Sequence, residues 1–185
     1  MDAIRKFFVC AKHWQVLLVV LGVLGISDVI AVWWKLPGDG GWRARFLPLF
    51  LSTELCAIVF AAWFWSLGTF LSSAVSPDLR LGTKLFRVAA IFPAVYFPFF
   101  DITALSLSPA LFMVIFPLYV FATFCLFYVL YFVSKSLVLA ERAETVEFPQ
   151  YIGTLFLIWF FPIGVWFTQP RINRLYSRAT PGLSA

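Results

Sequence analysis

The sequence predicts an all-α fold: a polytopic membrane helix bundle of about five transmembrane helices, forming one domain over residues 1–185. Composition is the first reason, because 62% of the residues are hydrophobic and 20% are aromatic, while only 12% are charged. A soluble domain carries about 25% charged residues, so this chain has about half the charge that a water-facing surface needs. The second reason is length, because the apolar residues fall in runs near the roughly 20 residues that a helix needs to cross about 30 Å of hydrocarbon.

The first two predicted spans are residues 14–34 and 46–75. The first has Trp14 at one end and Trp34 at the other, as expected for residues in the two interfacial belts, and a loop rich in proline and glycine follows it. The apolar run contains no small-x-small cleavage site, so we expect a retained helix and no signal peptide. The second run is longer than a perpendicular crossing requires, so the helix is expected to tilt or to place its first turn among the headgroups.

The third and fourth predicted spans are residues 85–106 and 109–133. Asp101 is the only formal charge from Val88 to Val133, and a Ser-Leu-Ser-Pro sequence between the two spans predicts the reversal. An alternative remains open. It has four spans plus a re-entrant segment at 88–100, because that apolar stretch is short for a span.

A polar segment over residues 135–150 separates the fourth span from the last. We expect it to extend the fourth helix into water until Pro149 stops it. The last predicted span is residues 151–168, and a short tail rich in Ser, Pro and Gly, residues 179–185, is expected to fray.

Lysine and arginine residues predict the orientation. With the N-terminus inside, five spans place eight of the 14 Lys and Arg residues inside and six outside, and the four-span alternative places nine inside and five outside. The positive-inside rule therefore favours a cytoplasmic N-terminus in the cell (inner) membrane and leaves the side of the C-terminus open.

Three carboxylates lie within apolar runs: Asp28, Glu54 and Asp101. An ionised group near the bilayer centre costs at least about 2.5 kcal/mol, so each of them needs a partner or a role. In the five-span arrangement all three face one side of the membrane, which makes them a candidate cation or proton site. The alternative is structural: Asp28 hydrogen-bonds a neighbouring helix, and Glu54 pairs with Arg43 or Arg45.

The C-terminal block of residues 159–173 has the sequence WFFPIGVWFTQPRIN. It resembles the C-terminal signature of a group of small multipass bacterial membrane proteins. The same resemblance extends to residues 12–15, 63–68, 116–119 and 134–135. It implies a bacterial multipass protein, and it brings no activity, cofactor or partner with it.

Four polar or helix-breaking residues of this block form a candidate interfacial or partner motif: Gln169, Pro170, Arg171 and Asn173. Pro170 interrupts the helical hydrogen-bond ladder, so the sequence predicts a helix stop at the membrane interface, where Arg171 meets lipid phosphates. The alternative is a docking motif for a partner protein.

Catalytic and cofactor-binding motifs do not occur in the sequence. His13 is the only histidine, the three cysteines are far apart, and no P-loop, dinucleotide fingerprint, H-E-x-x-H or G-x-S-x-G motif is found. The basic residues form no stripe that could bind nucleic acid. We therefore expect no cofactor and no metal, and a non-enzymatic accessory, scaffold or envelope component. Its partners would be the lipid bilayer and either a second copy or another membrane protein. The alternative is a small ion- or proton-coupled transporter or channel subunit that uses the three carboxylates.

Overall fold

The structure is a computed structural model that describes residues 2–33, 42–104 and 109–179. Within these ranges, the side chains of residues 2–5, 24, 26–28, 30–33, 42–53, 98, 101–104 and 109–111 are not described. The described residues form helices and no strand, which confirms the all-α prediction. In chain order the elements are α1 (Asp2–Cys10), α2 (His13–Trp33), α3 (Trp42–Ala74), the short 3-10 helix η1 (Pro77–Leu79), α4 (Thr83–Ala104), α5 (Pro109–Arg142), α6 (Phe148–Trp159) and α7 (Phe161–Ala179).

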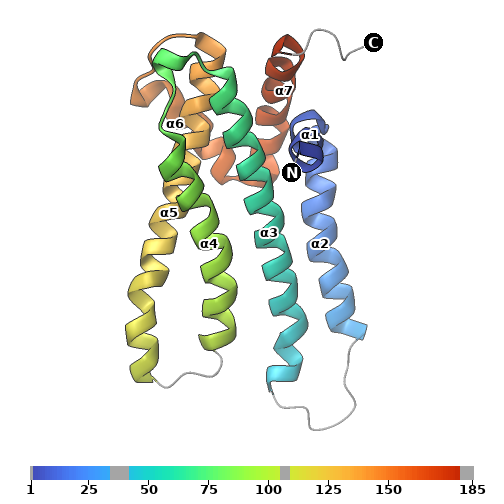
Figure 1. The fold of residues 1–185 in the computed structure, drawn as a ribbon. Helices are drawn as coiled ribbons and strands as arrows, with labels where there is room; N and C mark the ends of the chain where they lie inside the picture. Colours follow the sequence, from blue (N-terminus) through green and yellow to red (C-terminus); the bar gives the residue numbers. More distant parts are fainter. Residues whose placement is uncertain (1, 34–41, 105–108, 180–185) are drawn as a thin grey trace.

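The four long helices α2 to α5 run along the long axis of the molecule, and the shorter α1, α6 and α7 gather at one end (Figure 1). Helix α2 packs on α3, and α4 packs on both α3 and α5. Helix α6 runs from the upper end of the view toward the middle, and α7 returns to the upper end, so the two form a helical hairpin of partial depth. Helix α1 lies in the same half of the molecule and contacts α3 and α7. We call the end that carries α1, η1 and the C-terminus of α7 the α1 end.

Helices account for the described residues of the first four predicted spans up to Ala74 in the second, and residues 34, 105 and 106 lie outside the described residues. Helix α4 runs without a break through 88–100, the stretch of the alternative re-entrant segment. Among the described residues, two stretches are long and apolar enough to cross a membrane: Glu54–Ala74 in α3 and Phe112–Arg142 in α5. His13–Val23 is a shorter apolar helix within α2. The structure therefore shows an all-helical chain with two candidate spans, and the count of five is not confirmed.

The prediction of one helix over residues 151–168 is wrong, because the chain bends at Phe160. The backbone at Phe160 leaves the helical region, with φ −84° and ψ 60°, and a new helix begins at the next residue. Pro162 favours the break, since proline lacks an amide donor and its ring clashes with the carbonyl four residues earlier in a continuous helix. Gly164 then lies so close to the backbone of Leu157 that a Cβ atom at this position would overlap the Leu157 carbonyl.

Two predicted helix stops at proline are also wrong. Helix α5 ends at Arg142, followed by Ala143 with φ 55°, and Pro149 lies in the first turn of α6, where a missing amide donor costs nothing. Helix α7 continues through Pro170 to Ala179, so Gln169-Pro170 is no helix end. One proline removes a single donor, which the contacts of a packed helix can offset. Residues 180–185 of the predicted tail lie outside the described residues.

A large part of the described core lies in the half that contains the α1 end. Trp63, Leu67 and Leu71 of α3 are buried there, and the ring of Phe86 on α4 stacks on that of Phe132 on α5, with ring centroids 4.3 Å apart. Gly68 makes room for this stack, because a Cβ atom there would meet the Phe86 ring. In this half the helices therefore approach closely enough to hold fixed positions.

Candidate functional site

The three predicted intramembrane carboxylates lie on α2, α3 and α4. The side chains of Asp28 and Asp101 are outside the described residues, so their predicted convergence with Glu54 stays a prediction. Glu54 is partly buried, and both of its carboxylate oxygens are shielded from solvent. It lies on the face of α3 that carries Ala57 and Ala61, three and seven residues later in the chain.

Gln169 of the candidate interfacial motif holds the end of α1. Its side chain is fully buried, and its Nε2 atom donates to the carbonyl oxygens of Phe8 at 2.8 Å and Ala11 at 3.0 Å. These carbonyls lie at the C-terminal end of α1, where no helical amide follows to meet them. Asn173, one turn further along α7, donates to the Ala11 carbonyl at 3.3 Å. The two amide side chains therefore cap α1 and fix it to α7.

Arg171 ties α7 to the other neighbouring helices. Its Nε donates to Oε1 of Glu141 at 2.7 Å, its Nη2 contacts Oε2 of the same carboxylate, and its Nη1 donates to Oγ1 of Thr154 at 3.1 Å. Glu141 belongs to the last turn of α5 and Thr154 to α6. The side chains of Arg171 and Glu141 are 28% and 27% exposed, so solvent screens this bidentate pair only in part.

These five side chains form what we call the polar clamp: Gln169, Asn173, Arg171, Glu141 and Thr154. In the structure Arg171 pairs with Glu141, whereas the sequence placed it against lipid phosphates. Sequence reasoning missed Glu141 and Thr154, since nothing local relates residues that are 30 and 17 positions away from their partner. Three residues of the motif therefore join α7 to α1, α5 and α6 of the same chain.

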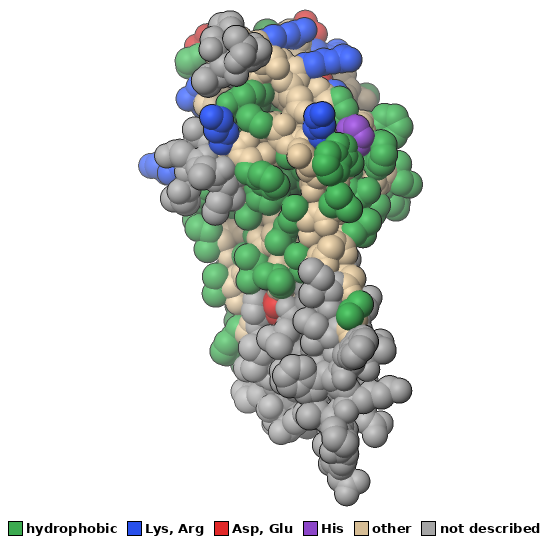
Figure 2. All heavy atoms as spheres, turned by 90° about the vertical axis from the view of Figure 1, so that its right-hand side faces the viewer, with side chains coloured by type: hydrophobic (Ala, Val, Ile, Leu, Met, Phe, Trp, Pro, Cys, Tyr) green, Lys and Arg blue, Asp and Glu red, His purple; other side chains and the backbone are tan. Residues whose placement is uncertain are grey.

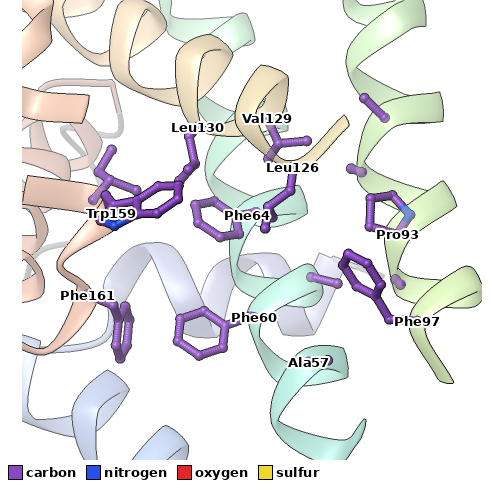
Figure 3. Close-up of a pocket in the computed structure, with 15 residues that line it drawn as sticks. Ala57, Phe60, Phe64, Pro93, Phe97, Leu126, Val129, Leu130, Trp159 and Phe161 are labelled. Carbon is purple, nitrogen blue, oxygen red and sulfur yellow. The ribbon is translucent and has the colours of Figure 1, made fainter. Parts of the chain in front are cut away.

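A cavity of about 370 Å³ lies between α3, α4, α5 and the tip of the helical hairpin. Figure 3 shows aromatic rings from α3 and from both sides of the bend at Phe160 around it. Five alanines on α3 and α4 leave the space open, and apart from the indole N–H of Trp159 the lining side chains are apolar. The lining residues are Ala57, Phe60, Ala61 and Phe64 of α3; Ala89, Ala90, Pro93, Ala94 and Phe97 of α4; Leu126, Val129 and Leu130 of α5; and Ile158, Trp159 and Phe161 at the hairpin tip.

The cavity was not predicted, although the sequence holds a signal for it. Alanines recur four residues apart at Ala57 and Ala61 on α3 and at Ala90 and Ala94 on α4, so each helix presents a smooth strip. Two such strips face the same space, while the bend at Phe160 ends the hairpin before it fills that space.

Neither a metal site nor a known relative indicates the function of the described residues. Among the described residues, no group of three or more His, Cys, Asp or Glu side chains could hold a metal ion. No family model matches the chain, and no curated protein or solved structure is detectably similar to it. The function is therefore argued from the chain's own residues.

Proposed function

We propose that the chain is a multi-pass protein of the bacterial inner membrane, with α2 to α5 as four spans and the α6–α7 hairpin entering from one side only. Helices α2 and α4 have 21 and 22 residues, which at about 1.5 Å per residue suits about 30 Å of hydrocarbon. Helix α6 has 12 residues and reaches about 18 Å, too little to cross. This proposal replaces the count of five spans.

Charge supports this arrangement and its orientation. With four spans and a hairpin, eleven of the 14 Lys and Arg residues belong to segments at the α1 end, and three belong to the connection between α2 and α3 or its flanks. On the face shown in Figure 2, the described Lys and Arg side chains gather in the upper part, and the described side chains directly below them are mostly hydrophobic. The positive-inside rule then favours a cytoplasmic α1 end, with both termini on that side. The eleven are Arg5, Lys6, Lys12, Arg80, Lys84, Arg87, Lys135, Arg142, Arg171, Arg174 and Arg178; the three are Lys35, Arg43 and Arg45.

For the role in the membrane, we propose a non-enzymatic accessory, scaffold or envelope component. The polar clamp carries this proposal, because its five side chains bind one another or the carbonyls of α1 and so fix the shape of the cytoplasmic end. A fixed shape is what a protein needs in order to hold a partner in one position. The partner would be a second copy or another membrane protein.

One observation favours a second candidate, a small ion- or proton-coupled transporter. Glu54 lies on an apolar helix with both carboxylate oxygens shielded, and intramembrane carboxylates of this kind mark ion and proton paths. This function would depend on Asp28 and Asp101 as well.

Reconstitution in liposomes separates the two candidates. Purified protein is tested for proton and potassium flux as wild type, as the double variant Asp28→Asn with Glu54→Gln, and as Asp78→Asn, a control at an exposed position in η1. The accessory proposal expects no flux above empty liposomes, together with one membrane partner or a second copy recovered at constant stoichiometry after crosslinking in cells. A flux that the double variant abolishes and the control retains would establish the transporter instead.

A further inference from the structure

We propose that the apolar cavity between α3, α4, α5 and the hairpin tip binds one acyl chain of a membrane phospholipid. The inference rests on the membrane placement proposed above. The accessory role does not need a bound ligand, so the lipid is an addition to that role.

The position of the cavity within the bundle is the first argument. The lining residues of α3 lie ten to seventeen residues before Ala74, and those of α5 lie twelve to sixteen residues before Arg142, both at the α1 end. At about 1.5 Å per residue, these positions are about 15 to 25 Å below that end. Helix α5 extends beyond the hydrocarbon at this end, so the cavity lies within the hydrocarbon core, which is about 30 Å thick, at a depth that acyl chains occupy.

The lining chemistry is the second argument. A buried water needs two to four polar partners, and among the lining side chains only the indole N–H of Trp159 could offer one. A known cavity of about 150 Å³ with a Leu, Ile and Phe lining stays dry and binds benzene or xenon. The present cavity is more than twice as large. If it were empty, many of the atoms that line it would have no partner for dispersion contacts.

Accessibility is the third argument. The cavity is partly open and not sealed within the core. At this depth the opening faces lipid, and the molecules that surround it are acyl chains. The side chain of Trp159 is 46% exposed beside the cavity, and its ring stacks on that of Phe127 with centroids 4.8 Å apart, which gives an entering chain a flat apolar wall.

The shape of the lining suits a flexible linear chain. Alanines on α3 and α4 form smooth strips, while rings of Phe60, Phe64 and Phe161 close the side nearest the hairpin (Figure 3). A chain has rotatable bonds and fills an irregular apolar space by adjusting them, whereas a planar ligand needs a slot. The space is bounded by three long helices whose positions the core fixes, so it would persist in the membrane.

Photocrosslinking from a phospholipid tests the proposal. The protein is placed in nanodiscs of phosphatidylethanolamine and phosphatidylglycerol that contain a phospholipid with a diazirine at the end of one acyl chain. After irradiation, crosslinked peptides are mapped by mass spectrometry. We expect crosslinks on the lining stretches 57–64 of α3 and 89–97 of α4, in addition to those on the outer surface of α5.

A matched pair of variants makes the test specific. Ala94→Phe places a ring inside the cavity, and Val95→Phe places the same ring on the adjacent residue, which is 65% exposed on the outside of α4. Crosslinks to the lining should be lost in the first variant and kept in the second, while crosslinks to outer α5 residues such as Val114 stay unchanged in both. Ala61→Leu is a milder filling variant that should lower lining crosslinks even if Ala94→Phe does not fold.

Three results would overturn the proposal. The first is crosslinking of the lining in Ala94→Phe at the wild-type level, and the second is crosslinking confined to outward residues in the wild type. The third is lining crosslinks that disappear as more copies are placed in each disc, because a second copy would then be the occupant. Extraction of the wild-type protein from membranes by alkaline carbonate would instead contradict the membrane placement, so the two failures can be told apart.

Discussion

Replacing Gln169 with leucine should release α1 from the bundle. Leucine has a similar volume, so no large cavity forms, but both hydrogen bonds to α1 are lost, together with a longer one to Oδ1 of Asn173 at 3.4 Å. The carbonyl of Phe8 then has no donor in a buried position, at a cost of about 1 to 3 kcal/mol. The carbonyl of Ala11 keeps the bond from Asn173 at 3.3 Å, so its loss is smaller, about 1 kcal/mol.

One term opposes this cost. The Oε1 atom of Gln169 is buried and has no hydrogen-bond partner among the described residues, and leucine removes that acceptor together with the donor. Removing that unsatisfied acceptor offsets about half of the cost, so we expect a net loss of about 1 to 2 kcal/mol in the free energy that holds α1 in place.

Hydrogen exchange followed by mass spectrometry measures this loss directly. A difference of about 1 to 2 kcal/mol corresponds to a decrease of about 5- to 30-fold in the protection of amides in α1. Gln150→Leu is the matched control: Gln150 is exposed, and its Oε1 accepts from the Glu147 amide in the first turn of α6. That variant should leave α1 unchanged. Equal protection of α1 in Gln169→Leu and in the wild type would refute the capping role.

The remaining predictions concern the rest of the clamp, the hairpin and the thiols. Arg171→Met leaves Glu141 partly buried without its partner and should cost about 1 to 3 kcal/mol in thermal unfolding; an unchanged melting temperature would show that the pair contributes little. Gly164→Ala forces a Cβ atom into the backbone of α6 and should cost at least about 3 kcal/mol, more than Gly68→Ala, where an aromatic ring can shift; the reverse order in thermal melts would contradict the described bend. Of the three thiols only that of Cys10 is exposed, so a maleimide should modify one site per native chain, as counted by intact mass; rapid modification of a second site would place another cysteine at the surface.

The long helices could be predicted because their signal is local. The apolar run at 14–34 is visible without any knowledge of neighbouring helices, and α2 covers 13–33. The same is true for the extension of the fourth helix beyond residue 133, since α5 ends at Arg142. The length of the apolar run and the positions of the charged residues determine where such helices lie, and both can be read without tertiary contacts.

The bend at Phe160 and the role of Gln169 depend on distant contacts. Hydropathy is continuous across the bend, so a window of residues shows one span there, and the break depends on how closely α6 and α7 can pack at Gly164. The partner of Gln169 is 161 residues away in the chain, at Phe8. The missing amide donor of Pro170 predicts a helix stop, whereas the contacts of α7 with α1, α5 and α6 keep the helix intact.

The partial depth of the hairpin also gives the molecule an unequal width along its long axis. Among the described residues, all seven α-helices contribute to the half at the α1 end, whereas α2 to α5 alone extend through the other half (Figure 1). In a bilayer such a wedge displaces more lipid from one leaflet than from the other. Each inserted copy would therefore add area to the leaflet at the α1 end, and crowded copies would bend the membrane toward the opposite side or gather where it is already curved.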